Sequence, residues 1–205
     1  MLMKKRIIEL AEKSLDFQLD LSLCSIYLLK YLEYLIPYYS FLYLVSREFK
    51  PKMMVEIGTY WGIGAIHLAL GNPEGKVITI DKMDWFQETI HKFCQNENIM
   101  NIKAIVGESA KMASSFADNS IDLLFIDGDH EYIAEKEDYI KYFPKVKDNG
   151  IILIDDIQQT KEMERFWEEV KDCKFDINFI RQANSIRPEQ GVGFGVVLKG
   201  GFDEG

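Results

Sequence analysis

Positive charge is scarce in this sequence. Its 24 lysines and arginines face 33 aspartates and glutamates, and the formal net charge is -9 at pH 7. Proteins that bind nucleic acid or anionic membranes present a basic face, because phosphate groups are negatively charged. The composition therefore argues against both kinds of partner and favours a small molecule.

Cysteine is also rare, with three residues in a chain of 205. Cys24, Cys94 and Cys173 are far apart, odd in number and without the spacing of a metal site. We interpret them as small buried side chains in a reducing compartment, and we expect a cytoplasmic location. Histidine and cysteine form no cluster that would suit zinc.

Long uncharged apolar runs are missing as well. The most apolar region, residues 19–45, contains Lys30 and Glu33 and is broken by Pro37. No uncharged run approaches the roughly 20 residues of a bilayer span, so we expect no membrane span. Charged residues interrupt the first 15 residues in the same way, which argues against a secretory leader.

Tyrosine, by contrast, is frequent near the N-terminus, and such amphipathic rings suit interfaces that are partly wet. We predict that residues 1–50 form a helical arm within one domain, residues 51–199 its main body and residues 200–205 a polar tail. The arm packs on the edge of the domain, or serves as a substrate lid or as the surface of a homo-oligomer. The tyrosines concerned are Tyr27, Tyr31, Tyr34, Tyr38, Tyr39 and Tyr43.

Beyond residue 50, short apolar runs alternate with segments of helical periodicity. This alternation predicts an α/β fold with a doubly wound, mostly parallel sheet of seven strands. Asp129 is expected to cap the helix near residue 130, and residues 147–150 to form a turn. Strands are expected at 53–57, 75–80, 102–106, 121–127, 151–154, 175–180 and 193–198, and the main helices at 63–70, 84–96, 130–143 and 158–170.

A glycine-rich turn between the first strand and the first helix organises the chain. Gly58, Gly62 and Gly64 follow the strand, at positions where the backbone turns tightly and a ligand can approach closely. In a parallel α/β sheet, ligands bind in the crevice at the carboxyl ends of the strands. The turn is therefore a candidate binding site.

Three strands end in a carboxylate, at Asp81, Asp127 and Asp155. Parallel pairing places all three at the rim that carries the glycine turn. Asp81 follows the second strand, where an acid can accept hydrogen bonds from the two hydroxyls of a ribose. The rim therefore favours a ligand that contains a nucleoside.

The spacing of the glycines argues against a dinucleotide. A dinucleotide fold uses G-x-G-x-x-G, so that pyrophosphate can approach a helix N-terminus. Here Tyr60 and Trp61 fill the space that pyrophosphate would use. Glu56 would repel phosphate and suit a cationic ligand.

These motifs together resemble the class I S-adenosylmethionine-dependent methyltransferases, over residues 53–198. Within that family, Asp127-Gly128-Asp129-His130 with Asp155-Asp156 is similar to the small O-methyltransferases of the catechol type and, more closely, of the macrolide and cephalosporin tailoring group. The resemblance implies a Rossmann-like methyltransferase fold and methyl transfer to a hydroxyl oxygen of a small molecule. The motifs that carry it are Glu56-x-Gly58-x-x-x-Gly62-x-Gly64, Asp81, Gly107-Glu108-Ser109 and Ile126-Asp127-Gly128-Asp129-His130.

The resemblance also implies roles for single residues. The glycine turn would hold the methionine part of the cofactor, Asp81 the ribose, and Glu108 with Ser109 would border the adenine. The expected cofactor-binding residues are Glu56, which would support the turn, and Gly58, Thr59, Tyr60, Gly62, Asp81, Glu108, Ser109 and Asp127.

In the metal-dependent relatives, the residues that match Asp127, Asp155 and Asp156 hold one divalent cation. Carboxylate oxygens suit Mg²⁺, Ca²⁺ or Mn²⁺, and we expect Mg²⁺ first. Neighbouring strand residues point to opposite faces, so Asp155 and Asp156 can both ligate only if the strand has ended at Asp156. The catechol enzymes have an amide at that position, and the alternative is that Asp156 caps the next helix.

His130 lies three residues after Asp127, at the mouth of the crevice. An unperturbed imidazole titrates near pH 6.5, which suits proton abstraction, and we predict His130 and Asp127 as the catalytic pair. The other interpretation of His130 is a packed or solvated side chain.

Two other functions stay open at this point. One is a nicotinamide-dependent oxidoreductase on a similar sheet, and the other is a methyltransferase-like protein that binds without turnover. The acceptor is not identifiable, because acceptor contacts would come from the arm and from loops such as residues 182–190.

Overall fold

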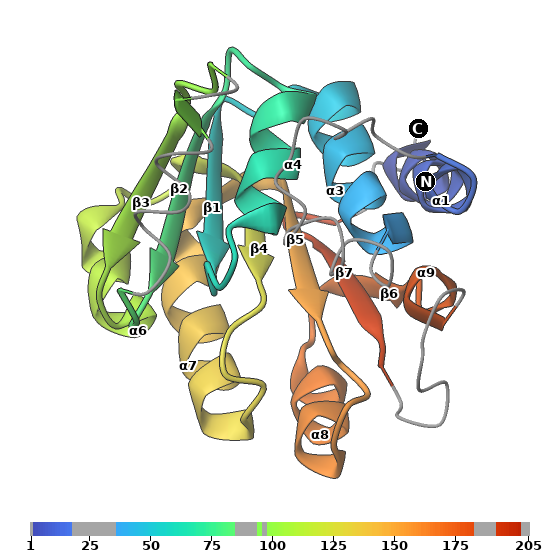
Figure 1. Cartoon of the computed structure of the whole chain (residues 1–205). Helices are drawn as coiled ribbons and strands as arrows, with labels where there is room; N and C mark the ends of the chain where they lie inside the picture. The colour runs from blue at the N-terminus through green and yellow to red at the C-terminus, as the bar shows by residue number, and fades with distance from the viewer. Residues whose placement is uncertain (1, 18–35, 85–93, 96–97, 183–191, 202–205) are drawn as a thin grey trace.

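A seven-stranded sheet forms the centre of the protein in a computed structural model that describes residues 2–17, 36–84, 94–95, 98–182 and 192–201 (Figure 1). The strand order is β3-β2-β1-β4-β5-β7-β6. Strands β1 to β5 pair in parallel, and β7 runs antiparallel to both β5 and β6. The predicted mostly parallel sheet is thus confirmed. The strands are β1 (Met53–Ile57), β2 (Lys76–Asp81), β3 (Ile102–Val106), β4 (Ile121–Ile126), β5 (Val146–Asp155), β6 (Cys173–Asp176) and β7 (Phe194–Leu198).

Helices cover both faces of the sheet (Figure 1). One face carries α1 (Leu2–Ser14), α3 (Ile36–Phe49) and α4 (Ile63–Gly71), and the other carries α7 (Tyr132–Tyr142) and α8 (Lys161–Glu169). Short helical turns complete the described chain: α6 (Ser109–Met112), η1 (Ala113–Ser115), η2 (Phe143–Lys145) and α9 (Phe179–Gln182). No helix among the described residues is long and apolar enough to span a bilayer.

Alternating side chains of the strands divide the core into two layers. In β4, Leu123 and Phe125 join the layer under α1, α3 and α4, whereas Leu124 and Ile126 join the layer under α7 and α8. All four side chains are fully buried. Strands buried on both faces are expected to be continuous apolar runs, and residues 123–126 of β4 form such a run.

The described part of the N-terminal arm contributes to the core. On α3, Phe41, Leu42 and Val45 are fully buried, and the hydroxyl of Ser46 donates a hydrogen bond to the carbonyl oxygen of Leu68 on α4 at 2.7 Å. Removing α3 would expose one face of the sheet. The lid or dimer surface was predicted on the arm as a whole, and residues 18–35 of the arm lie outside the described residues, so both roles stay predictions.

The prediction of a strand over residues 175–180 is wrong in its second half. Strand β6 ends at Asp176, and its pairing with β7 ends there too. The side-chain oxygen of Asn178 accepts a hydrogen bond from the backbone N–H of Phe194 at 2.8 Å, and α9 begins at Phe179. The N–H of Ile177 still donates to the carbonyl oxygen of Phe194 at 2.9 Å, but the side chain of Asn178 takes the place of the return bond, and apolar periodicity alone does not reveal this contact.

Residues 147–150 form no separate turn, contrary to the prediction. They belong to β5, where Asn149 takes a left-handed conformation with φ 65° and donates its N–H to the carbonyl oxygen of Lys199 at 2.7 Å. The pairing of β4 with β5 shifts register between Ile121 and Leu123. The Asp-Asn-Gly signal therefore marks an irregularity within a strand.

Of the predicted helices, one is shorter in the structure and one lies mostly outside the described residues. Helix α8 begins at Lys161, because Thr160 caps it by accepting a hydrogen bond from the N–H of Met163 at 3.1 Å. It is therefore shorter at both ends than the predicted 158–170. The helix predicted at 84–96 lies almost entirely outside the described residues.

Candidate active site

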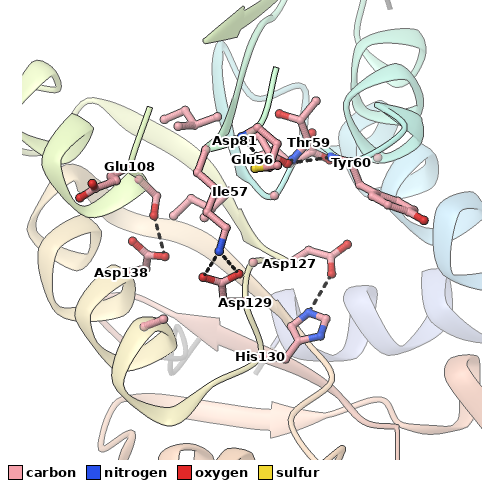
Figure 2. A pocket seen from close by; sticks show the side chains of 18 of the residues that line it. Glu56, Ile57, Thr59, Tyr60, Asp81, Glu108, Asp127, Asp129, His130 and Asp138 are labelled. Carbon is pink, nitrogen blue, oxygen red and sulfur yellow. Dashed lines mark hydrogen bonds and ion pairs between the residues drawn. The ribbon is translucent and has the colours of Figure 1, made fainter. Parts of the chain in front are cut away.

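A cavity of about 770 Å³ opens at the carboxyl ends of β1, β2 and β4, and we call it the rim cavity (Figure 2). Ligand sites of this size are common at this edge of α/β sheets. Gly62, Asp155 and Asp156 are not among its lining residues. The predicted residues that do line it are Glu56, Gly58, Thr59, Tyr60, Asp81, Glu108, Ser109, Asp127 and His130.

The glycine turn passes directly against the end of β4. Gly58 has φ 92°, and a Cβ atom built on it would lie 1.8 Å from the carbonyl oxygen of Asp127. Any other residue would collide with the backbone, so glycine is required here. Gly62 has φ 73° and is the N-cap of α4. The turn therefore lies directly against the backbone of Asp127 at its start and leads into α4 at its end.

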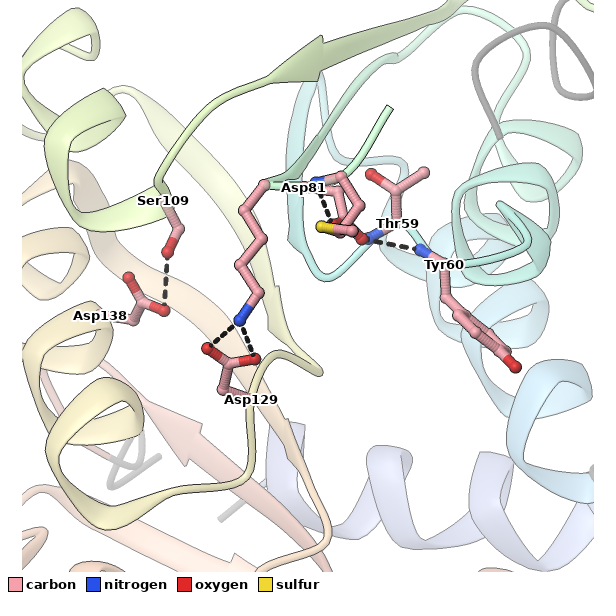
Figure 3. Close-up of polar contacts among 8 residues, drawn as sticks. Thr59, Tyr60, Asp81, Ser109, Asp129 and Asp138 are labelled. Atoms are coloured by element: carbon pink, nitrogen blue, oxygen red, sulfur yellow. Dashed lines mark hydrogen bonds and ion pairs between the residues drawn. The ribbon is translucent and has the colours of Figure 1, made fainter. Parts of the chain in front are cut away.

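Asp81 holds the turn in place, a role that its spacing did not reveal (Figure 3). Its Oδ2 accepts hydrogen bonds from the backbone N–H groups of Thr59 and Tyr60, both at 3.0 Å, and its Oδ1 accepts one from Met83 at 2.9 Å. Tyr60 has φ 41°, a conformation that costs free energy for a residue other than glycine. The carboxylate thus stabilises a strained turn and keeps lone pairs for a ligand.

Glu56 lies beneath the same turn and is 1% exposed. Its carboxylate accepts a hydrogen bond from the hydroxyl of Thr79 at 2.5 Å, and a Cβ atom on Gly64 would lie 2.1 Å from its Oε1. Burial raises the pKa of Glu56 well above its usual value, and the charges of Asp127 and Asp81 raise it further. This favours the neutral carboxyl, so Glu56 supports the turn more than it repels phosphate.

A buried acid, Asp138 on α7, adds to the predicted adenine corner. The hydroxyl of Ser109 donates a hydrogen bond to its Oδ2 at 2.9 Å, and Asp138 is 5% exposed. Burial raises its pKa to about 6. No local sequence pattern indicates this pair, because 29 residues separate its members.

An ion pair crosses the rim cavity between the loops after β2 and β4 (Figure 3). The Nζ of Lys82 lies 2.7 Å from both carboxylate oxygens of Asp129. Asp129 therefore does not cap α7, contrary to the prediction; the N-cap is Glu131, without a side-chain hydrogen bond. Both partners of the pair are about half exposed, so it adds little stability.

His130 lies between two carboxylates. Its Nε2 is 3.1 Å from Oδ1 of Asp127, a contact visible in Figure 2, and its Nδ1 is 3.2 Å from Oδ2 of Asp156. Burial lowers the pKa of His130, but the hydrogen bond to Asp127 and the charges of Asp127, Asp156 and Asp155 outweigh burial and raise it to about 9. The two carboxylates thus favour the protonated imidazole, and the neutral ring that can accept a proton gains population as the pH approaches about 9.

Carboxylate oxygens, which suit a hard cation, lie together at this end of the rim. One ligand atom each from Asp127, His130 and Asp155 lie within 4.8 Å of one another. Strand β5 ends at Asp155, and Asp156 follows with φ 53°, so the chain has left the strand as the predicted ligand pair requires. Asp156 is outside that group of three and pairs with His130. The predicted set Asp127, Asp155 and Asp156 stays a prediction, and it requires His130 to move aside.

Tyr38 on α3 is a site residue that sequence reasoning missed. Its hydroxyl donates a hydrogen bond to Oδ2 of Asp127 at 2.6 Å. The two residues are 89 positions apart. The tyrosine-rich arm was the available signal, but it did not single out this ring.

A model of a methyltransferase domain family matches residues 55–157, about half of the chain. The chain belongs to this methyltransferase family. The match covers the glycine turn, Asp81, His130 and the three acids predicted as metal ligands. The predicted resemblance is confirmed, and the nicotinamide-dependent alternative is not favoured.

Relatives and solved structures agree with this assignment. The domain is 27% identical over 118 residues to a catechol O-methyltransferase of Mycobacterium tuberculosis, an alignment that covers 57% of this chain and 52% of that protein. This chain spans about half the length of that relative and of two other curated relatives.

Two solved O-methyltransferases share the fold. TomG from Streptomyces achromogenes, in complex with SAM, is 17% identical with a TM-score of 0.64, over 80% of this chain and 81% of that one. The O-methyltransferase of Bacillus cereus, in complex with SAH, is 18% identical with a TM-score of 0.63, over 78% of this chain and 79% of that one. The Rossmann-like methyltransferase fold is therefore confirmed.

Proposed function

We propose that this methyltransferase domain transfers a methyl group from S-adenosylmethionine to a hydroxyl oxygen of a small molecule, with the help of a divalent cation. The observation that carries the proposal is the convergence of the glycine turn, Asp81 and Asp127 on one cavity. The names of the relatives support the oxygen acceptor. Cytoplasmic location and assembly through the arm stay predictions.

Methyl transfer is a displacement at carbon, so the protein chiefly aligns the acceptor oxygen, the methyl group and the sulfur. In this proposal, the turn at residues 58–62 and Asp81 place the cofactor. His130 takes the proton that the acceptor hydroxyl loses. A divalent cation held by Asp127, Asp155 and Asp156 would lower the pKa of that hydroxyl and orient it.

Replacing Asp81 tests the cofactor site. Asp81→Ala should weaken binding of S-adenosylmethionine by about 1.5–3 kcal/mol, because it removes hydrogen bonds to a charged acceptor and frees the strained turn. Isothermal titration measures the effect. Asp122→Ala is the matched control, since Asp122 also accepts a hydrogen bond from a backbone N–H, that of Met53 at 2.8 Å, at the opposite end of the sheet. Undiminished affinity for S-adenosylmethionine in Asp81→Ala would show that Asp81 does not bind the cofactor.

Removing the cation tests the second half of the proposal. Protein treated with a chelator should keep its affinity for S-adenosylmethionine but lose most of its turnover, because the acceptor hydroxyl would keep its high pKa. Readdition of Mg²⁺ or Mn²⁺ should restore turnover. Formation of S-adenosylhomocysteine is the readout. Equal rates before and after chelation would show that the cation has no part in catalysis.

The charge of the rim cavity bears on the acceptor. Its described lining includes Glu108, Asp129 and Glu137, and its described cations are Lys82, which is paired with Asp129, and His130. An acceptor with phosphate groups would meet negative charge here. Neutral hydroxylated compounds, catechols among them, are therefore the first class to screen.

A further inference from the structure

The carboxylate of Asp127 has two different partners, one for each oxygen. Oδ1 lies 3.1 Å from Nε2 of His130, and Oδ2 accepts the hydrogen bond from Tyr38 at 2.6 Å. Tyr38 comes from the N-terminal arm and is 2% exposed, whereas the side chain of Asp127 is 24% exposed. Oδ2, on the buried side of the carboxylate, thus contacts the arm, and Oδ1 lies beside His130 at the rim.

The ring of Tyr38 is fixed by aromatic neighbours. Its centroid lies 5.8 Å from that of Phe125, 5.5 Å from that of Phe194 and 4.5 Å from that of Tyr39. Phe125 is on β4, two residues before Asp127, which directly follows that strand. Packing against β4 therefore sets the position of the hydroxyl relative to Asp127, and little rotation of the ring is open to it.

We propose that Tyr38 is a positioning residue that fixes the carboxylate of Asp127 and presents Oδ1 alone to the cation. This inference rests on the proposed function. With Oδ2 held by Tyr38, Asp127 has Oδ1 left for a cation, and Asp127, His130 and Asp155 each have one ligand atom within 4.8 Å of the others. A carboxylate without this bond would rotate, and its buried oxygen would lose a partner. The arm is then part of the active site.

The test compares the binding of Mn²⁺ by the wild-type protein and by two variants. Titration calorimetry and the paramagnetic resonance spectrum of the ion measure the binding. Tyr38→Phe removes the hydroxyl and keeps the ring. Tyr139→Phe is the matched control. Tyr139 is on α7, is not among the residues that line the rim cavity, and donates its hydroxyl to a carboxylate oxygen of Asp172 at 2.7 Å. Tyr38→Phe should bind Mn²⁺ about 10- to 100-fold more weakly, as loss of a hydrogen-bonded support of a metal ligand does.

Tyr139→Phe should bind Mn²⁺ like the wild type, and both variants should keep their affinity for S-adenosylmethionine. Equal affinity for Mn²⁺ in Tyr38→Phe and in the wild type would overturn the role of Tyr38 and leave the proposed function intact. An equal loss in both variants would also overturn it, since the cause would be general stability. A wild-type protein that binds no Mn²⁺ would instead refute the cation of the proposed function, and this inference with it.

Discussion

The His130→Ala variant is expected to lose roughly 10²- to 10⁴-fold in turnover while it still binds S-adenosylmethionine, as removal of a general base does. His130 lies within hydrogen-bond distance of Asp127 at the edge of the rim cavity. If the cation alone activates the acceptor hydroxyl, the same variant should lose little turnover, because the cation already stabilises the developing charge. The size of the loss separates the two mechanisms.

The dependence of turnover on pH gives a second criterion. Only the neutral imidazole can accept a proton, and the neighbouring carboxylates raise the pKa of His130 to about 9. Turnover of the wild type should therefore rise with pH until about pH 9, or level off earlier if a bound cation offsets the carboxylate charges. His130→Ala should lose this rise. Glu131→Gln, which removes a neighbouring charge and keeps the imidazole, should retain it.

Profiles of the wild type and of His130→Ala that superimpose at saturating cation would end the general-base hypothesis. His130 would then be a cation that holds Asp127 and Asp156 together.

The parts of the site that follow from chain topology were predictable. Asp81, Asp127 and Asp155 each come directly after, or at the end of, an apolar run, and parallel pairing of β2, β1, β4 and β5 brings such positions to one edge. A glycine at position 58 was also predictable in kind, because a tight turn and a close approach of a ligand were expected there; the close approach of the Asp127 backbone was not predicted. Local pattern and sheet connectivity are sufficient for these residues.

Contacts that depend on tertiary packing were not predictable. Tyr38 meets Asp127 because α3 packs against the sheet, and no local pattern selects that tyrosine among its neighbours. Asp129 pairs with Lys82 across the cavity instead of capping a helix, since the two loops face each other. The end of β6 at Asp176 depends likewise on the hydrogen bond from Phe194 to the side chain of Asn178. Each outcome is decided between segments far apart in sequence.

Glu135→Met is expected to raise the free energy of unfolding, by up to about 5 kcal/mol near pH 8. Glu135 is fully buried on α7, and neither carboxylate oxygen forms a hydrogen bond within the described residues. Burial raises its pKa to about 8. An unpartnered buried carboxyl costs stability, and methionine has a similar volume and suits a helix.

The gain should depend on pH in a defined direction. Below pH 4.5, the carboxyl is protonated in both the folded and the unfolded chain, and its ionisation costs nothing. Between pH 4.5 and about 8, the unfolded chain releases the proton and the folded chain keeps it, so stability falls by about 1.4 kcal/mol per pH unit. Glu135→Met removes this slope. Its stabilisation should therefore be small at pH 5 and largest at pH 8.

Denaturant unfolding at pH 5 and pH 8 measures both quantities. Glu137→Met is the matched control, since Glu137 lies on the exposed face of the same helix and pairs with Lys141 at 2.8 Å. That variant should change stability by less than about 0.5 kcal/mol at either pH. A Glu135→Met protein no more stable than the wild type, or equally stabilised at both pH values, would contradict the assignment of a buried, proton-binding carboxyl. The charge of His130 lowers the pKa of Glu135, so the two groups interact. A stabilised variant that also loses turnover would indicate that this costly side chain is retained for catalysis.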